Sequence, residues 1–229
     1  MKGAYFKADL HIHTHFSKDS LSEPRAILRA AVNRGLSAVA ITDHNEIKGA
    51  FSAAHIAREE EIPLQVIIGE EVMCDEGDLL VYFLKRKISP GPLGQVLKEV
   101  KRQGAVCCAA HPYDFGRHAI DLSKVPEKSL GAIGAIEVFN ARVPQKSMNG
   151  RALSFAIAHG KAELAGSDAH HPSEVGAAYA EFPGITYLGA KSLISAPRKI
   201  GGSRSTPLVR FYSRYAALKK RLFPGKAQQ

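Results

Sequence analysis

Along residues 1 to 190, short runs of apolar and β-branched residues alternate with longer segments whose apolar positions recur at helical spacing. The runs predict seven strands, at residues 5–12, 37–42, 64–70, 79–84, 105–110, 135–140 and 162–167. Helical spacing predicts four helices between them, near residues 23–34, 46–60, 92–103 and 147–159. Strands and helices that alternate in this way are typical of an α/β fold built from βα units.

Polar side chains with ligand or catalytic chemistry stand at the ends of these strands. They are His11 and His13, Asp43 and His44, Glu70 and Glu71, His111, Asn140, and Asp168 and His170. In a βα barrel the carboxyl ends of the strands converge on one mouth, so side chains far apart in sequence meet there. Because adjacent strand residues face opposite ways, only one of Glu70 and Glu71 can enter that site.

The first of these segments, ADLHIHTHFSKDS at residues 8–20, favours a metal site. His11 and His13 are two residues apart on a strand and therefore point to the same face, and Asp19 follows in the next loop. Imidazoles and carboxylates without thiolates are ligands for Mn, Fe or Zn. A cluster of more than four such ligands predicts two or three divalent ions rather than one structural zinc.

Charge is divided unevenly along the chain. Residues 191–229 contain ten Lys or Arg and no acid, whereas residues 1–190 contain 21 bases and 22 acids. This division predicts one nearly neutral domain at 1–190 and a basic C-terminal extension at 191–229.

The extension is expected to be helical near residues 207–222. Leu208, Phe211, Tyr215 and Leu222 recur there at helical spacing with bases between them. We expect this apolar face to pack on the domain, with the basic face in water. The alternative is an arm that binds nucleic acid or an anionic membrane through its bases.

Neither secretion nor membrane insertion is indicated by the sequence. No uncharged apolar run approaches about 18 residues, and the first residues lack the apolar segment and cleavage site of a signal peptide. We therefore expect a cytoplasmic protein without a transmembrane segment. The three cysteines, Cys74, Cys107 and Cys108, form no CxxC pair and favour reduced thiols over disulfides or a zinc ribbon.

Six motifs resemble the PHP family, which is named after polymerase and histidinol phosphatase domains. They span residues 8 to about 180 in the family's order: DLHIHTHFSKDS, AITDHN, IIGEEV, AAHPYD, IEVFNAR and AGSDAHH. The resemblance implies an α/β fold, a distorted seven-stranded (β/α)7 barrel of PHP type, here with a basic helical tail at the C-terminus. It also implies two or three divalent ions and hydrolysis of phosphoesters.

A set of metal ligands is implied by the same resemblance. It places His11, His13 and Asp168 on a first ion, Glu71 as a bridge to a second ion that His111 joins, and Asp19, His44 and His170 on a third. Relatives often have a histidine on the strand after the bridging glutamate. This chain has Asp78 there, which is a further candidate ligand.

Clustered divalent ions lower the pKa of a bound water and neutralise phosphoryl oxygens, so hydrolysis by a metal-activated hydroxide needs no nucleophilic serine or cysteine. Arg117, Arg142 and Asn140 follow strands at the same mouth and are candidate contacts to the substrate phosphate. We expect a phosphoesterase acting on a small phosphomonoester or nucleotide, because the domain shows no basic and aromatic stripe. A phosphodiesterase or exonuclease acting on oligonucleotides and a non-catalytic metal-binding PHP module are the alternatives.

Overall fold

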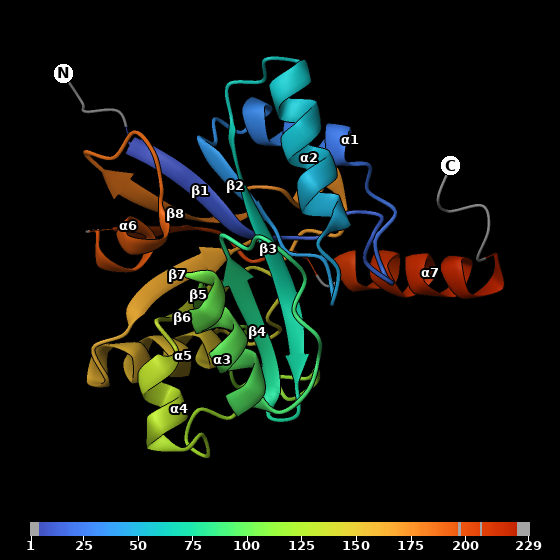
Figure 1. The fold of residues 1–229 in the computed structure, drawn as a ribbon. Helices are drawn as coiled ribbons and strands as arrows, with labels where there is room; N and C mark the ends of the chain where they lie inside the picture. Colours follow the sequence, from blue (N-terminus) through green and yellow to red (C-terminus); the bar gives the residue numbers. More distant parts are fainter. Residues whose placement is uncertain (1–4, 197, 207, 224–229) are drawn as a thin grey trace.

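The computed structural model describes residues 5–196, 198–206 and 208–223. Its strands are β1 (Tyr5–Ile12), β2 (Ala38–Ile41), β3 (Gln65–Cys74), β4 (Gly77–Tyr82), β5 (Val106–Ala109), β6 (Ala135–Asn140), β7 (Ala162–Gly166), β8 (Ala178–Pro183) and β9 (Lys199–Gly202). Its helices are α1 (Pro24–Asn33), α2 (Lys48–Glu59), α3 (Leu93–Gln103), α4 (Glu127–Ala132), α5 (Lys146–Ala158), α6 (Ala190–Ser195) and α7 (Val209–Leu222), with a 3₁₀ turn at Pro172–Glu174 (Figure 1).

Within the described residues, nine strands form one sheet in the order β7-β6-β5-β4-β3-β2-β1-β8-β9. The sheet curls until β7 returns to β1. There, the His13 amide donates to the Ala169 carbonyl and the Asp168 amide donates to the His11 carbonyl, both at 2.8 Å. The result is a nearly closed barrel whose first and seventh strands lie side by side at the mouth.

Each of the seven strands and four helices predicted from the hydrophobic pattern is present, but the seven-strand count is not confirmed because β8 and β9 continue the sheet beyond β1. The βα repeat is also interrupted at β3 and β4. These strands are joined only by Asp75 and Glu76, so no crossover helix fits and they pair antiparallel. β4 therefore brings its first residues, including Asp78, to the mouth.

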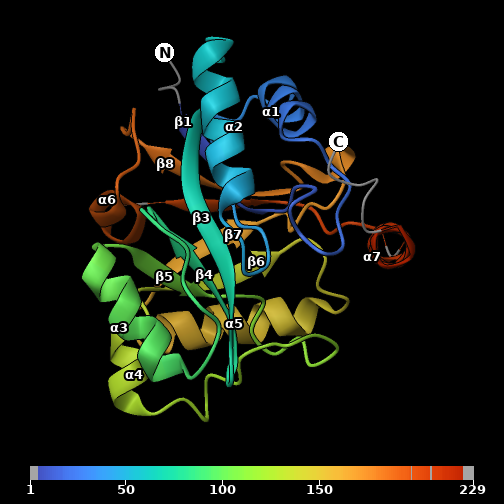
Figure 2. The ribbon, with the colours of Figure 1, turned by 45° about the vertical axis from the view of Figure 1, so that its right-hand side comes forward.

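Apolar side chains fill the barrel interior and the layers around it. The interior combines small and large buried residues from several strands: Ala8, Leu10, Ala38, Ala40, Ile67, Leu80, Tyr82, Leu164, Ala180 and Phe182. Outside, α1 and α2 cover β1 and β2, while α3 and α5 cover the half of the sheet formed by β4 to β6 (Figure 2). Because the interior is filled, polar groups at the mouth form a separate layer at one end.

Closure of the barrel requires glycine at Gly166, the last residue of β7. A Cβ at this position would lie 2.2 Å from His11 Cβ and 2.8 Å from His11 N. Alanine would therefore push β7 away from β1 and displace His11 and Asp168, two predicted metal ligands in or just after these strands.

We expect Gly166→Ala to lower the free energy of unfolding by about 1–3 kcal/mol and to lower metal content as well. Thermal melting and elemental analysis measure the two effects. Gly150→Ala is the matched control, since an added Cβ in that part of α5 meets nothing within 4 Å. A Gly166→Ala protein with wild-type melting temperature and metal content would show that the strands do not need this close approach.

Helix α7 docks on the mouth through its polar side, not through its apolar face. The prediction that Leu208, Phe211, Tyr215 and Leu222 pack on the domain is wrong, because these side chains are 71%, 64%, 58% and 61% exposed. The rim of the mouth offers backbone carbonyls and carboxylates, which attract the bases of the helix instead. Ala216 is the helix residue that becomes buried.

The expected helix start at residue 207 lies outside the described residues, as do residues 224–229 of the extension. The boundary between a domain at 1–190 and an extension at 191–229 stays a prediction, and the structure adds that residues 199–202 join the sheet by pairing with β8. All three cysteines are free and buried. None of the helices in the described ranges is long and apolar enough to cross a membrane.

Candidate metal centre

His11 in β1 and His13, the residue after the end of this strand, lie beside each other at the mouth. Their Nε2 atoms lie 3.1 Å apart, and each is 3.4 Å from Glu71 Oε2. Asp168 Oδ1 approaches the same two nitrogens, at 3.7 Å from His11 and 3.4 Å from His13. All four side chains are buried. Two imidazole nitrogens and two carboxylate oxygens thus converge on one point.

Hydrogen bonds on the far side of each ring decide which nitrogen faces this point. His11 Nδ1 donates to Glu137 Oε1 at 2.9 Å. His13 Nδ1 donates to Ser17 Oγ at 3.0 Å, because the Ser17 hydroxyl already gives its hydrogen to Asp43 Oδ1 at 2.7 Å. When both rings are neutral, the lone pairs of the two Nε2 atoms face each other, and a cation between them satisfies both.

The local electrostatics also favour positive charge between the rings. Burial opposes a charged imidazole, yet the surrounding carboxylates, Asp168 foremost, raise the pKa of His11 well above its ordinary value. Burial and the neighbouring histidines instead lower the pKa of His13. Together with the donor set of imidazoles and carboxylates, this arrangement fits a divalent ion.

Glu71 connects this first group of side chains to a second. Its Oε1 accepts a hydrogen bond from His111 Nε2 at 2.9 Å, and its Oε2 lies 2.8 Å from His44 Nδ1. Glu71, His111 and Asp78 form one cluster whose ligand atoms all lie within 4.8 Å of one another. Asp78 is therefore placed where it could complete a second ion site.

A third group surrounds Asp19. Asp19 Oδ2 lies 3.3 Å from His170 Nε2 and 3.5 Å from His44 Nε2. The ring nitrogens of His13, His44 and His170 also fall within 4.8 Å of one another. The structure therefore brings all eight predicted ligands and Asp78 into one contiguous cluster at the mouth.

The neighbouring glutamates face opposite sides of β3. Glu71 enters the cluster, whereas Glu70 Oε2 accepts a hydrogen bond from the Ile88 amide at 2.9 Å. Burial raises the pKa of Glu70 to about 7. The strand alternation thus leaves a single inward carboxylate at this position.

Two of the clustered residues have left-handed backbone conformations, with φ of 28° at His111 and 57° at Asp168. Such conformations are unfavourable for residues with a Cβ, and they persist where surrounding contacts hold them. At Asp168 the amide is held by the His11 carbonyl. The left-handed backbone at His111 and Asp168 therefore directs both side chains into the cluster.

Arg117 lies over this cluster and lines the pocket at the mouth, which has a volume of about 340 Å³. Its Nη1 contacts the Asp168 carboxylate, and its Nε donates to Asp114 Oδ2 at 2.9 Å. The Asp168 and Asp114 carboxylates raise the pKa of Arg117 further above its already high value, against the effect of burial. The guanidinium is held in place beside a predicted metal ligand.

Arg142 and Asn140 hold neighbouring groups in position. Arg142 is buried, and its Nη2 donates to the Val209 carbonyl at 2.9 Å and to Ser213 Oγ at 2.6 Å. Asn140 is also buried, and its Nδ2 donates to Glu137 Oε2 and Asp168 Oδ2, both at 3.1 Å. In this arrangement Arg142 joins α7 to the mouth, and Asn140 orients a candidate metal ligand.

Glu137 is a site residue that sequence reasoning missed. Besides holding His11, its Oε2 accepts a hydrogen bond from the His111 amide at 2.6 Å. The sequence does indicate this residue, because Glu137 is an acid within the otherwise apolar part of the strand sequence AIEVFN. Arg210, Ser213 and Arg214 of α7 also line the pocket and were not predicted as site residues.

Two family models and a sequence relative match this chain. Residues 9–129 match the family model described as PHP domain, and residues 146–199 match the one described as PHP-associated. An uncharacterised protein of Methanocaldococcus jannaschii is 35% identical over 167 residues, which cover 66% of this chain and 91% of that protein.

Solved structures share the fold. A two-domain protein of Bacteroides vulgatus, described as containing a predicted PHP-like metal-dependent phosphoesterase, superposes with a TM-score of 0.70 at 19% identity, over 88% of this chain and 66% of the other. Endonuclease Q, in a complex with a 27-mer duplex carrying an abasic lesion at the active site, superposes with a TM-score of 0.64 at 16% identity. That match covers 89% of this chain and 60% of the other.

Proposed function

Because the chain belongs to the PHP domain family, we propose that it is a metal-dependent phosphoesterase that hydrolyses a small phosphomonoester or nucleotide. The observation that carries the proposal is the pair of facing Nε2 atoms of His11 and His13, each turned inward by a hydrogen bond on its other nitrogen. Around this pair lie enough imidazoles and carboxylates for two or three ions.

His11, His13 and Asp168 would hold a first ion, with Glu71 between it and a second ion near His111. The second ion would also have Asp78 within reach, and the remaining group of Asp19, His44 and His170 would hold a third. When bound, such ions activate a water for attack and neutralise the phosphoryl oxygens.

The protein's own side chains then have separate tasks. Glu137 fixes the ring of His11, and Asn140 fixes the carboxylate of Asp168. Arg117, aimed by Asp114, presents a guanidinium beside the cluster, where it would bind the oxygens of the phosphate under attack. A largely buried cluster below a 340 Å³ pocket favours a small substrate over a long strand.

The proposal is tested by incubating the metal-replete protein with a panel of phosphomonoesters, nucleotides and short oligonucleotides, with and without a chelator. We expect hydrolysis of one or more phosphomonoesters, lost with the chelator and restored by Mn, Fe or Zn. Cleavage confined to internal phosphodiester bonds would favour the exonuclease or phosphodiesterase alternative. Absence of any hydrolysis by protein that retains its ions would favour the non-catalytic module.

We expect Arg117→Ala to lower kcat/KM by about 10- to 150-fold, a loss of about 1.5–3 kcal/mol that is typical of a charged hydrogen bond. Arg117→Lys should recover only part of the loss, since an ammonium cannot make a bidentate contact. Because Arg117 also contacts Asp168, metal content is measured in both variants. Wild-type kinetics combined with a lowered melting temperature would assign Arg117 to stability and not to substrate binding.

A further inference from the structure

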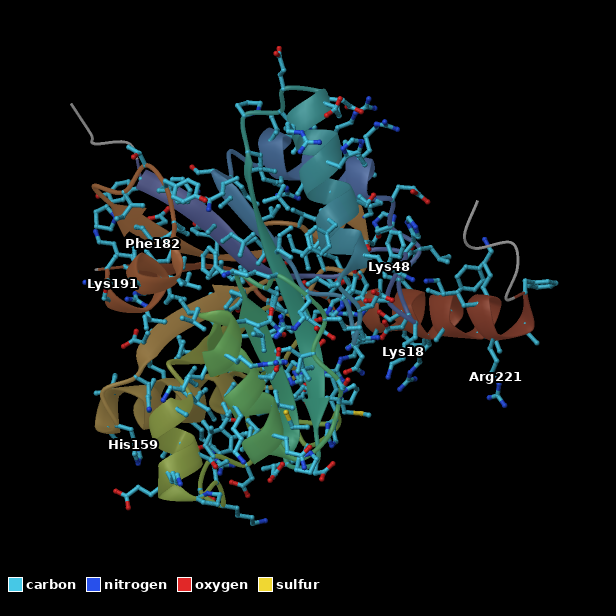
Figure 3. The ribbon with its side chains drawn as sticks, viewed as in Figure 1. Lys18, Lys48, His159, Phe182, Lys191 and Arg221 are labelled. Carbon is cyan, nitrogen blue, oxygen red and sulfur yellow. The ribbon has the colours of Figure 1, made fainter. Side chains whose placement is uncertain are left out.

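The pocket above the metal centre has a wall that none of the predicted metal ligands provides. Helix α7 contributes Arg210, Ser213 and Arg214 to this wall, and Lys18 from the loop after β1 lines the same pocket. Figure 3 shows Lys18 close to α7 where the helix leaves the barrel. Basic side chains from opposite ends of the sequence therefore meet at one side of the mouth.

Helix α7 is fixed against the mouth at both of its ends. Near its start, Arg142 donates to the Val209 carbonyl and Ser213 Oγ, and Arg210 Nη2 donates back to the Arg142 carbonyl at 3.0 Å. Near its end, Lys220 Nζ donates to the carbonyls of His15 and Ser17. The side chains that α7 turns toward the pocket are thus held at a defined position relative to the metal ligands.

The arginines of this wall carry more positive charge than the protein neutralises. Arg210 and Arg214 are four residues apart, so they project from the same face of the helix, where like charges repel. Asp114 Oδ2 is shared between Arg210 at 3.3 Å and Arg117 at 2.9 Å. Arg214 is exposed, and within the described ranges no hydrogen bond or ion pair engages it. An anion in the pocket would relieve this repulsion.

We propose that Arg210 and Arg214, together with Lys18, form a second anion subsite that binds a phosphate group of the substrate other than the one hydrolysed. The inference rests on the proposed function, because the metal cluster would take the phosphate under attack. Guanidinium groups bind phosphate through paired N–H donors but cannot bind metal, so this wall selects an anion and not a further ion. The substrate class is then a phosphoester with a second phosphate within reach.

Two kinds of substrate could carry the second phosphate. One is a small molecule with a phosphate at each end, and the other is a short oligonucleotide with a neighbouring phosphate. Both would place one phosphate on the metals and one between α7 and Lys18. In this proposal the basic extension contributes to substrate selectivity, because α7 would determine which phosphoesters bind tightly.

The kinetic test compares matched substrates. Monophosphates and bisphosphates of linear alkanediols with three to six carbons are assayed with wild-type protein, beside dinucleotides with and without a 5′-phosphate. We expect wild-type kcat/KM to be at least tenfold higher for a bisphosphate of suitable length than for its monophosphate. A larger preference for the 5′-phosphorylated dinucleotide would identify an oligonucleotide as the source of the second phosphate.

The variants test whether α7 causes this preference. We expect the double variant Arg210→Ala/Arg214→Ala to reduce the bisphosphate-to-monophosphate ratio of kcat/KM at least tenfold. The single variant Arg214→Ala, which breaks none of the described contacts, should reduce it in the same direction. Lys219→Ala/Arg221→Ala is the control, since it removes the same charge from exposed positions of α7 that do not line the pocket. An equal loss of preference in the control would overturn the proposal.

A binding measurement tests the second anion subsite independently of hydrolysis. Isothermal titration with propane-1,3-bisphosphonate and with propylphosphonate, neither of which is hydrolysed, measures the subsite even in a protein that shows no turnover. We expect tighter binding of the bisphosphonate, lost in Arg214→Ala and kept in the control. Equal affinity of the two ligands for the wild type would exclude the subsite, whereas Arg214-dependent binding without any hydrolysis would contradict only the proposed activity.

Discussion

Replacing His11 and His13 together by alanine is expected to remove bound metal and phosphoesterase activity at the same time. The two Nε2 atoms are the nitrogens that converge with Glu71 and Asp168, so the double variant removes both imidazoles from the first group of side chains. Metal ions contribute several kcal/mol of transition-state stabilisation. The loss of kcat/KM should therefore be at least about a thousandfold.

Elemental analysis and steady-state kinetics on the same preparation measure both effects. His55→Ala/His159→Ala is the matched control, because it removes two exposed imidazoles that do not line the pocket at the mouth. Both proteins should keep a cooperative melting transition. A His11→Ala/His13→Ala protein that retains the wild-type number of ions would show that the cluster does not depend on β1.

The second large effect is expected at Glu71, where Glu71→Gln should cost at least about 100-fold more activity than Glu70→Gln. Glu71 contacts His111 and His44 and lies 3.4 Å from both His11 and His13. Loss of its charge therefore weakens contacts to all three groups at once. Glu70 instead accepts a backbone hydrogen bond, which a glutamine oxygen also accepts.

Measurement of kcat/KM and metal content in the two isosteric variants tests the register of β3. Since a shift of one residue would exchange the faces of the two glutamates, equal losses in both variants, or a larger loss in Glu70→Gln, would contradict the assignment of the inward carboxylate.

The sequence predicted which side chains lie together at the mouth, for a physical reason; that they bind metal stays a prediction. Glu71 lies within β3, and His44 and Asp168 follow the ends of β2 and β7 within three residues. The strand ends of a barrel meet at one mouth, so such residues are brought together. The register of Glu70 and Glu71 also follows from the two-residue period of a strand, and the structure places Glu71 inside.

Strand periodicity does not predict Glu137 as a site residue, because the pairing of β6 is irregular. Its pairing with β7 shifts register between Glu137 and Phe139. With strict alternation, an inward Asn140 would turn Glu137 to the other face, but the irregularity lets both side chains reach Asp168 or its neighbours. Such a register shift depends on the partner strand, so the hydrophobic periodicity of a single sequence does not predict it.

The orientation of α7 was mispredicted for a related reason. The spacing of Leu208, Phe211 and Tyr215 correctly indicates an amphipathic helix, but it cannot reveal which face meets the protein. The face that docks depends on the docking surface, which here is a polar rim. Lys220 of α7 donates to a backbone carbonyl of this rim, and Arg142 of the rim donates to the Val209 carbonyl of α7. A helix placed against a polar mouth turns its basic side inward.

The most direct test of the proposed metal centre is a crystal structure of the metal-replete protein with anomalous scattering measured at the Mn, Fe and Zn edges. We expect at least two anomalous peaks in the mouth of the barrel, one of them bonded to the Nε2 atoms of His11 and His13. A single ion or none in the cluster, in protein purified with these metals present, would contradict the metal-dependent phosphoesterase centre proposed for this chain.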